Sequence, residues 1–133
     1  MPWPVAGALR LPRLAKLGRI LEDGLDTLKR AADAGVRIAF GTDLLGPLHE
    51  YQPQEFAIRA QVLPMRDVIK SATVMGAELL GLDGEVGRVA PGYRADLIVV
   101  DGDPSSDTTP LADPKHNLRA VMRDGVVIHS SIQ

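Results

Sequence analysis

The stretch that decides the fold is AGVRIAFGTD, residues 34–43. Its centre, Val36 to Phe40, is short, apolar and rich in β-branched residues, which predicts a mostly buried strand. Gly35 stands just before this strand and predicts a helix end, because the residue after a helix often needs a positive φ. Asp43 follows the strand after a Gly-Thr pair. The stretch therefore predicts a helix, a buried strand and a carboxylate beyond the strand's carboxyl end.

The residues on both sides of this stretch predict helices. An amphipathic helix is expected from about Leu11 to Ala32, where apolar residues recur at three- and four-residue steps. Residues 54–62 predict a second helix. A third is expected from Pro64, a favoured first helical residue, to a cap at Gly81. Its apolar positions are Met65, Val68, Ile69, Ala72, Met75 and Leu79.

The pattern changes from helical to extended after residue 81. Residues 85–92 predict a short strand that runs into a Pro-Gly turn. Residues 95–100 predict a strand with both faces covered, because residues 97–100 are continuously apolar. Residues 101–110 are rich in Asp, Ser, Thr and Pro, which is typical of a loop.

A hairpin is expected near the end of the chain. Residues 118–122 and 126–129 flank the pair Asp124-Gly125, which tolerates the positive φ angles of a type I′ turn. The first half of the chain is thus α/β and the second half is β-rich. The predicted fold class is α/β.

Length and composition exclude several classes of function. The chain has 133 residues, the size of one ordinary domain, and 45% of them are hydrophobic. Lys and Arg number 15 against 17 Asp and Glu, a net charge of −2 that offers no basic surface for nucleic acid or an anionic membrane. There is no cysteine, which removes disulfides, thiolate metal sites and cysteine nucleophiles and is typical of a reducing compartment. With no long apolar run and no signal-peptide pattern, we expect a cytoplasmic protein without nucleic-acid or membrane partners.

Asp43 is the first candidate for chemistry. Parallel α/β folds place their active sites beyond the carboxyl ends of buried strands. A carboxylate there can bind a divalent metal, or take a proton from water. The alternative is a turn residue or a helix N-cap, since Asp also serves in both positions.

The three histidines, His49, His116 and His129, do not form a metal-binding motif by spacing. His49 lies six residues after Asp43 and is the candidate for a place near the substrate, with a solvated loop position as the alternative. We expect His116 and His129 to be structural or exposed. A compact metal site made of Asp43, His49 and Glu55 is a further alternative.

Taken in order, the motifs of the chain resemble the amidohydrolase superfamily. Residues 34–43 look like the eighth barrel strand of that superfamily. They are followed by Glu55-Phe56, the helix SAT…GAELLG at residues 71–81, the segment GRVAPGYRADLIVVDGDP at residues 87–104, and VMRDGVV at residues 121–127. The set resembles the branch of imidazolonepropionase-like and Xaa-Pro dipeptidase-like enzymes.

This resemblance implies the last βα units of a (β/α)₈ barrel plus the C-terminal strands of its small β-sandwich. The implied division is residues 1–81 for the barrel part and residues 82–133 for the sandwich part. The resemblance also implies a metal-dependent hydrolase, with zinc the expected metal and small-molecule or dipeptide-like substrates. In such a site Asp43 binds the metal and moves protons to and from the attacking water.

The other metal ligands of the superfamily, its His-x-His pair among them, have no counterpart in this sequence. A zinc site generally needs three or four protein ligands. We therefore expect this chain to be inactive alone and to need the remaining barrel as a partner. The alternative is a non-catalytic, self-associating module derived from the same fold.

Overall fold

The computed structural model describes residues 23–132. The chain divides into two compact units, residues 1–36 and residues 37–133, and each is described by itself. The predicted division into a barrel part, residues 1–81, and a sandwich part, residues 82–133, differs from these two units and stays a prediction. None of the helices within residues 23–132 has the length and apolar character needed to cross a membrane.

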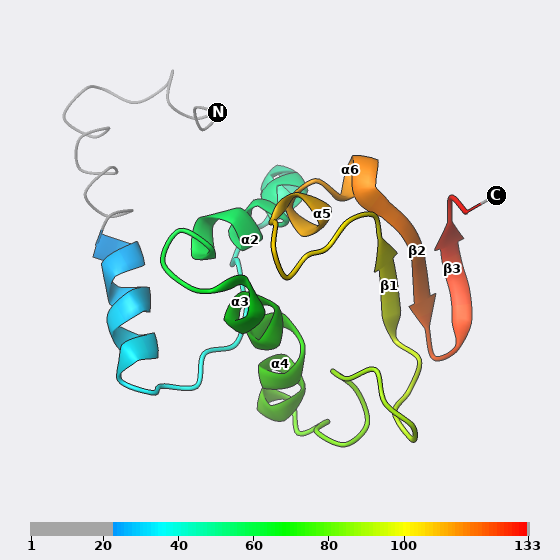
Figure 1. Cartoon of the computed structure of the whole chain (residues 1–133), viewed down its shortest axis with the longest axis horizontal. Coiled ribbons are helices and arrows are strands. Elements are labelled where there is room, and N and C mark those ends of the chain that lie inside the picture. Colours follow the sequence, from blue (N-terminus) through cyan, green and yellow to red (C-terminus); the bar gives the residue numbers. More distant parts are fainter. Residues whose placement is uncertain (1–22, 133) are drawn as a thin grey trace. The chain divides into compact units, whose positions relative to one another are not determined.

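The described part of the first unit is a helix of residues 23–33, drawn in blue in Figure 1. Leu25, Leu28 and Ala32, on the predicted apolar stripe, are half-buried. The helix ends as predicted at Gly35, which has a φ of 74°. The Gly35 N–H donates to the Ala32 carbonyl at 2.9 Å. The predicted start of this helix, from residue 11 to residue 22, lies outside the described residues.

The predicted strand at Val36 to Phe40 is wrong. These residues are extended but pair with no strand within residues 23–132. A strand forms only where a neighbouring strand supplies backbone partners. Here the Phe40 N–H instead donates to the carbonyl of Ser71, a helical residue, at 3.0 Å. Local β propensity therefore does not reveal whether a segment finds a strand to pair with.

Four short helices follow this segment in the second unit. They are η2 (Gly46–Tyr51), α2 (Gln54–Arg59), α3 (Met65–Ala72) and α4 (Val74–Leu79). The second predicted helix ends at residue 59 rather than 62. The third predicted helix is interrupted at Thr73, whose φ of −119° and ψ of −87° are not helical. Its predicted cap is correct, since Gly81 has a φ of 68°.

Contacts with both neighbouring and distant residues accompany the interruption at Thr73. The Ser71 carbonyl accepts the Phe40 N–H, so it is diverted from the helix ladder. The Thr73 hydroxyl donates to the Ile69 carbonyl at 2.8 Å, a contact that competes with regular helix bonding. Gly87 also lies so close that a Cβ on it would be 2.9 Å from the Thr73 carbonyl oxygen.

The best-buried side chains belong to these helices. Val68 in α3 is fully buried, and Ala77 in α4 is 5% exposed. The predicted stripe of the third helix is only partly buried, because Leu79 is 74% exposed. The core of the described residues is therefore small for a chain of this length.

The rest of the second unit carries a three-stranded antiparallel sheet with the order β1-β2-β3. The strands are β1 (Leu97–Val100), β2 (Leu118–Arg123) and β3 (Val126–Ser130). The predicted hairpin is confirmed as β2 and β3. Its turn residues Asp124 and Gly125 have φ angles of 50° and 79°, as a type I′ turn requires.

Two β predictions need correction. Residues 85–92 form turns rather than a strand, with a single isolated bridge between Asp83 and Val86. The strand β1 exists, but its faces are not both covered, because Ile98 and Val99 are 55% and 48% exposed. An apolar run fixes the strand but not what covers it.

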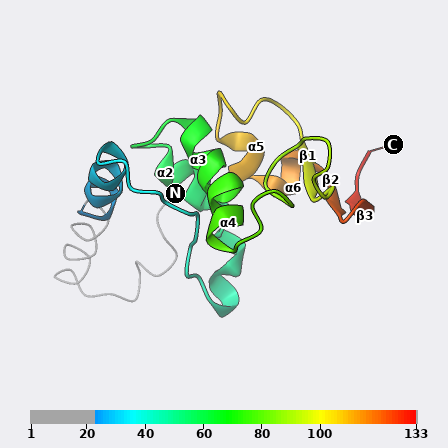
Figure 2. The same ribbon diagram turned by 90° about the horizontal axis from the view of Figure 1, so that it is seen from below.

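The connection between β1 and β2 contains two short helices that the sequence did not predict, α5 (Thr109–Ala112) and α6 (Pro114–Asn117). Both lie between the sheet and helices α2–α4 in the two views (Figures 1 and 2). The side chain of Gln54 in α2 donates to the Ala112 carbonyl at 3.2 Å. This contact ties the connection to the helical part.

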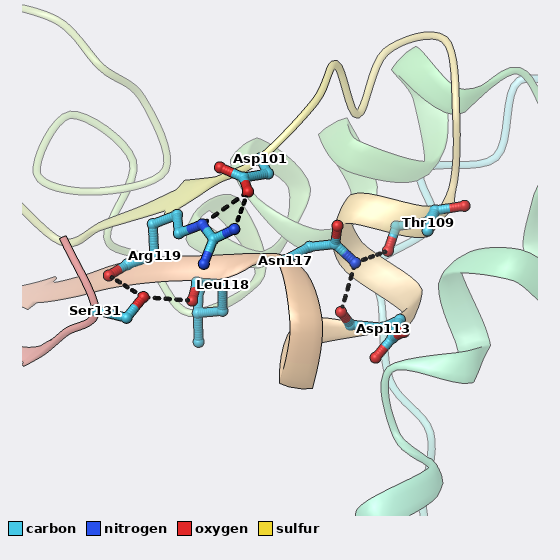
Figure 3. A network of polar contacts seen from close by, with 7 residues as sticks. All are labelled: Asp101, Thr109, Asp113, Asn117, Leu118, Arg119 and Ser131. Atoms are coloured by element: carbon cyan, nitrogen blue, oxygen red, sulfur yellow. Dashed lines mark hydrogen bonds and ion pairs between the residues drawn. The ribbon is translucent and has the colours of Figure 1, made fainter.

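Polar contacts fix the same connection to the sheet (Figure 3). The Arg119 guanidinium of β2 pairs with Asp101, just after β1, and Asn117 Nδ2 donates to the Asp113 carbonyl at 2.9 Å. The Ser131 hydroxyl donates to the Arg119 carbonyl at 3.3 Å. The pairing with Arg119 lowers the pKa of the Asp101 carboxyl.

Candidate functional site

Asp43 lies beyond the extended segment, at the start of the loop that leads into η2. Its side chain is exposed, and its φ of 51° is in the left-handed region. Asp is among the few residues other than glycine that visit this region readily. The N-cap alternative is wrong, because the N-cap position of η2 is Leu45 and no side chain caps that helix. Asp43 is thus an exposed carboxylate in a loop.

Arg59, at the end of α2, contacts the backbone of the segment that precedes Asp43. Arg59 is only 7% exposed. Its Nη1 donates to the Ala39 carbonyl and its Nη2 to the Gly41 carbonyl, both at 3.3 Å. One planar guanidinium therefore contacts the backbone on both sides of Phe40.

Two further contacts fix the orientation of this guanidinium. Arg59 Nε donates to Glu55 Oε1 at 2.8 Å, within the same helix. The guanidinium carbon lies 4.8 Å from the centroid of the Phe40 ring, a cation–π distance. Phe40 in turn packs against Phe56, with ring centroids 4.5 Å apart. The segment before Asp43 is therefore held by hydrogen bonds to its backbone and by ring contacts to its side chain.

Asp43, His49 and Glu55 do not form a three-ligand metal site within residues 23–132. His49 is exposed in η2. Glu55 faces Arg59 as its ion-pair partner. Within residues 23–132 no three His, Cys, Asp or Glu side chains are grouped so that they could hold a metal ion. The compact site of Asp43, His49 and Glu55 is therefore wrong, because Glu55 balances a buried cation instead.

The remaining titratable candidates have structural partners or are exposed. His116 pairs with Asp113 through Nδ1 at 2.8 Å on an exposed helix, and His129 is exposed on β3. These positions agree with the sequence prediction for both histidines. Arg94 pairs with Glu85, and this contact raises the pKa of Arg94.

The sequence reasoning missed Arg59. The available signal was the spacing Glu55 to Arg59, which places opposite charges one turn apart on a predicted helix. That spacing is usually a solvated surface pair. Its burial depends on Ala39 and Gly41, 20 and 18 residues away, which spacing alone does not reveal.

The residues described here do not fit a complete metal site. Zinc needs three or four protein ligands, and this region offers one exposed carboxylate at Asp43. Any further ligands would have to come from outside residues 23–132.

Comparison with known proteins identifies the family. The sequence pattern of the amidohydrolase family matches residues 6–129. The chain belongs to the amidohydrolase family.

Several solved amidohydrolase structures are similar to this chain. One crystal structure of an amidohydrolase is 40% identical and covers 83% of the chain, with a TM-score of 0.80. A prolidase complexed with N-methylphosphonate-L-proline is 36% identical over 92% of the chain, with a TM-score of 0.82. A Xaa-Pro dipeptidase with bound methionine is 35% identical over 79% of the chain, with a TM-score of 0.72. These neighbours confirm the predicted resemblance.

The curated relatives are named as deaminases rather than as dipeptidases. A 5-methylthioadenosine/S-adenosylhomocysteine deaminase of Desulfitobacterium hafniense is 31% identical over 81% of this chain, and one of Syntrophomonas wolfei is 34% identical over 60%. The chain spans only 29% and 21% of these two relatives. It likewise spans 27% of the first amidohydrolase structure and 30% of the prolidase. It thus corresponds to less than a third of an amidohydrolase chain of that length.

Proposed function

We propose that this chain forms the C-terminal portion of a metal-dependent amidohydrolase that hydrolyses amide or peptide-type C–N bonds. The observation that carries the proposal is the placement of Asp43. It is an exposed carboxylate at the end of a segment that a buried arginine holds, in a chain of this family.

In this proposal Asp43 has two roles. Its carboxylate is one ligand of a divalent metal, zinc by expectation, and the other ligands come from the remaining barrel. When bound, such a metal polarises the scissile carbonyl and activates water. The Asp43 carboxylate accepts a proton from the attacking water and returns it to the leaving nitrogen. His49, six residues further along, lies near the substrate in the assembled enzyme.

The proposed substrate is dipeptide-like. Deamination and dipeptide hydrolysis both break a C–N bond with water, so both sets of relatives fit the reaction type. We favour a peptide-type bond because the prolidase and Xaa-Pro dipeptidase structures are 36% and 35% identical to this chain over 92% and 79% of its length.

Transfer of this chain into a relative tests the proposal. The portion of the prolidase that matches this chain is replaced by this chain, and hydrolysis of Xaa-Pro dipeptides is measured. We expect the chimera to hydrolyse them in a way that a chelator abolishes and zinc or manganese restores. The chain by itself, with the same metals, is expected to show no turnover. An inactive but folded chimera would contradict the proposal, as would metal-dependent turnover by the chain alone.

A second candidate function is a non-catalytic module that associates with itself. Exposed apolar side chains on the sheet favour it, since exposed apolar surface is often covered by association. On the two outer strands of the sheet these side chains are Ile98, Val99, Val126, Val127 and Ile128, each 48% to 64% exposed. Sedimentation of the purified chain separates the two candidates. A discrete, zinc-independent oligomer supports the module, whereas a monomer would contradict it.

A further inference from the structure

The contacts of Arg59 reach beyond a local ion pair. Its partners lie on two elements, the Glu55 carboxylate on its own helix and the carbonyls of Ala39 and Gly41 on the extended segment. The Gly41 carbonyl is only two residues from Asp43 in sequence. Any change in how Arg59 is held must therefore alter the backbone immediately before the proposed catalytic carboxylate.

Burial makes the contacts of Arg59 costly to break. The Arg59 side chain is 9% exposed, and that of its partner Glu55 is 23% exposed. Charged groups removed from water are stable only when they are paired and hydrogen-bonded. No buried side-chain nitrogen or oxygen among the described residues lacks a hydrogen-bond partner. Arg59 therefore cannot leave the Ala39 and Gly41 carbonyls without a replacement for those bonds.

The geometry also requires an arginine. A guanidinium presents several N–H donors in a rigid plane, whereas a lysine ammonium is a point charge on a flexible stem. Here the plane contacts two carbonyls and one carboxylate while it also lies over the Phe40 ring. A lysine at this position could not make all of these contacts at once.

The backbone conformation of Asp43 connects the contacts of Arg59 with the proposed catalytic site. Asp43 holds a φ of 51°, which Asp adopts more readily than most residues but still at some cost in free energy, so the surrounding contacts help to keep it. The flanking backbone is fixed on one side by Arg59 and by the bond from the Phe40 N–H to the Ser71 carbonyl. We infer that Arg59 is a positioning residue, which orients the Asp43 carboxylate through the backbone carbonyls of Ala39 and Gly41. This inference rests on the proposed role of Asp43.

The test is nuclear magnetic resonance of the whole chain with Arg59→Met, which keeps an unbranched apolar stem over Phe40 but removes the N–H donors. We expect amide hydrogen exchange at Phe40 to become about tenfold faster, because the segment opens more often. Scalar and dipolar couplings of Asp43 should no longer fit its left-handed φ. Arg59→Lys should not restore either property.

Arg37 provides the matched control. It lies on the same segment and pairs with Glu78 at 3.0 Å, but its side chain is 79% exposed. Arg37→Met should change exchange at Phe40 by less than about twofold, as expected for a surface pair. Unchanged Asp43 couplings in a folded Arg59→Met variant would overturn the inference.

Two measurements keep the inference testable if Arg59→Met does not fold. In the unmutated chain, the side-chain N–H protons of Arg59 must exchange more slowly than those of Arg37, and equal rates would overturn the inference. Glu55→Gln keeps the guanidinium but weakens its anchor, so it should perturb residues 39–43 in the same direction and less strongly. None of these readouts needs activity. Failure of the chimera would therefore refute the catalytic role of Asp43 and leave the effect of Arg59 on the Asp43 backbone intact, whereas unchanged couplings would refute that effect whatever the chimera does.

Discussion

Gly87 provides the sharpest stability prediction. Its φ is 86°, and a Cβ at this position would lie 2.9 Å from the Thr73 carbonyl oxygen and 3.0 Å from the Ala77 Cβ. Real Cβ atoms do not approach a backbone oxygen so closely, so Gly87→Ala must push the loop of residues 82–96 away from α3 and α4. This contact therefore couples the region before the sheet to the helices that follow Asp43.

The expected loss has two parts. The left-handed backbone costs a residue with a Cβ roughly 1–2 kcal/mol. The steric overlap adds about 1–3 kcal/mol, the range for overpacking in a filled region. We therefore expect Gly87→Ala to lower the free energy of unfolding by about 2–5 kcal/mol in urea denaturation followed by circular dichroism.

Gly92 offers a matched control for the first part alone. Its φ of 88° is nearly the same, but a Cβ there would meet nothing within 4 Å. Gly92→Ala should cost only the backbone part, about 1–2 kcal/mol. The restriction of the unfolded chain by alanine is common to both variants and cancels in their difference. Equal losses in the two variants would refute the close approach of Gly87 to Thr73.

Two further predictions concern the core and acid pH. Val68→Ala empties a fully buried position and should cost about 2–3 kcal/mol in the same urea assay, whereas a loss below about 0.5 kcal/mol would contradict its burial. The pKa of Asp101 is lowered by Arg119, so the unfolded chain binds this proton first, and the stabilisation present above about pH 4 is lost as the pH falls further. Asp101→Asn should therefore flatten the decline of stability between about pH 5 and pH 2, and an unchanged slope would contradict the pairing.

The sequence predicted those parts of the fold that depend on neighbouring residues. Gly35 ends its helix and Asp124-Gly125 forms its turn because both need positive φ angles, which are local properties. The segment from Val36 to Phe40 is not the predicted strand, because strand pairing depends on partners elsewhere in space. The Phe40 N–H donates to the carbonyl of Ser71, which joins the segment to a helix rather than to a strand.

The difference between local and distant contacts also decides which parts of the candidate site the sequence predicts. Asp43 was recognised because its position after an apolar run is visible in the sequence. The break at Thr73 was not, because it depends on Phe40 and Gly87, which lie far away along the chain. The burial of Arg59 was missed for the same reason. Its partners are the backbone carbonyls of Ala39 and Gly41, and because every residue has such a carbonyl, the sequence does not reveal the contact.

The most direct test of the proposed function is the rate of proline release by the prolidase chimera with Asp43→Asn. An asparagine keeps the size of the side chain and tolerates the left-handed φ, but it cannot accept the proton. The account predicts a kcat/KM at least about 100-fold lower, the usual scale for loss of a general base. The exposed Asp83→Asn should change it by less than about twofold, as expected for a surface position. A value for Asp43→Asn within about threefold of the unsubstituted chimera would contradict the central claim.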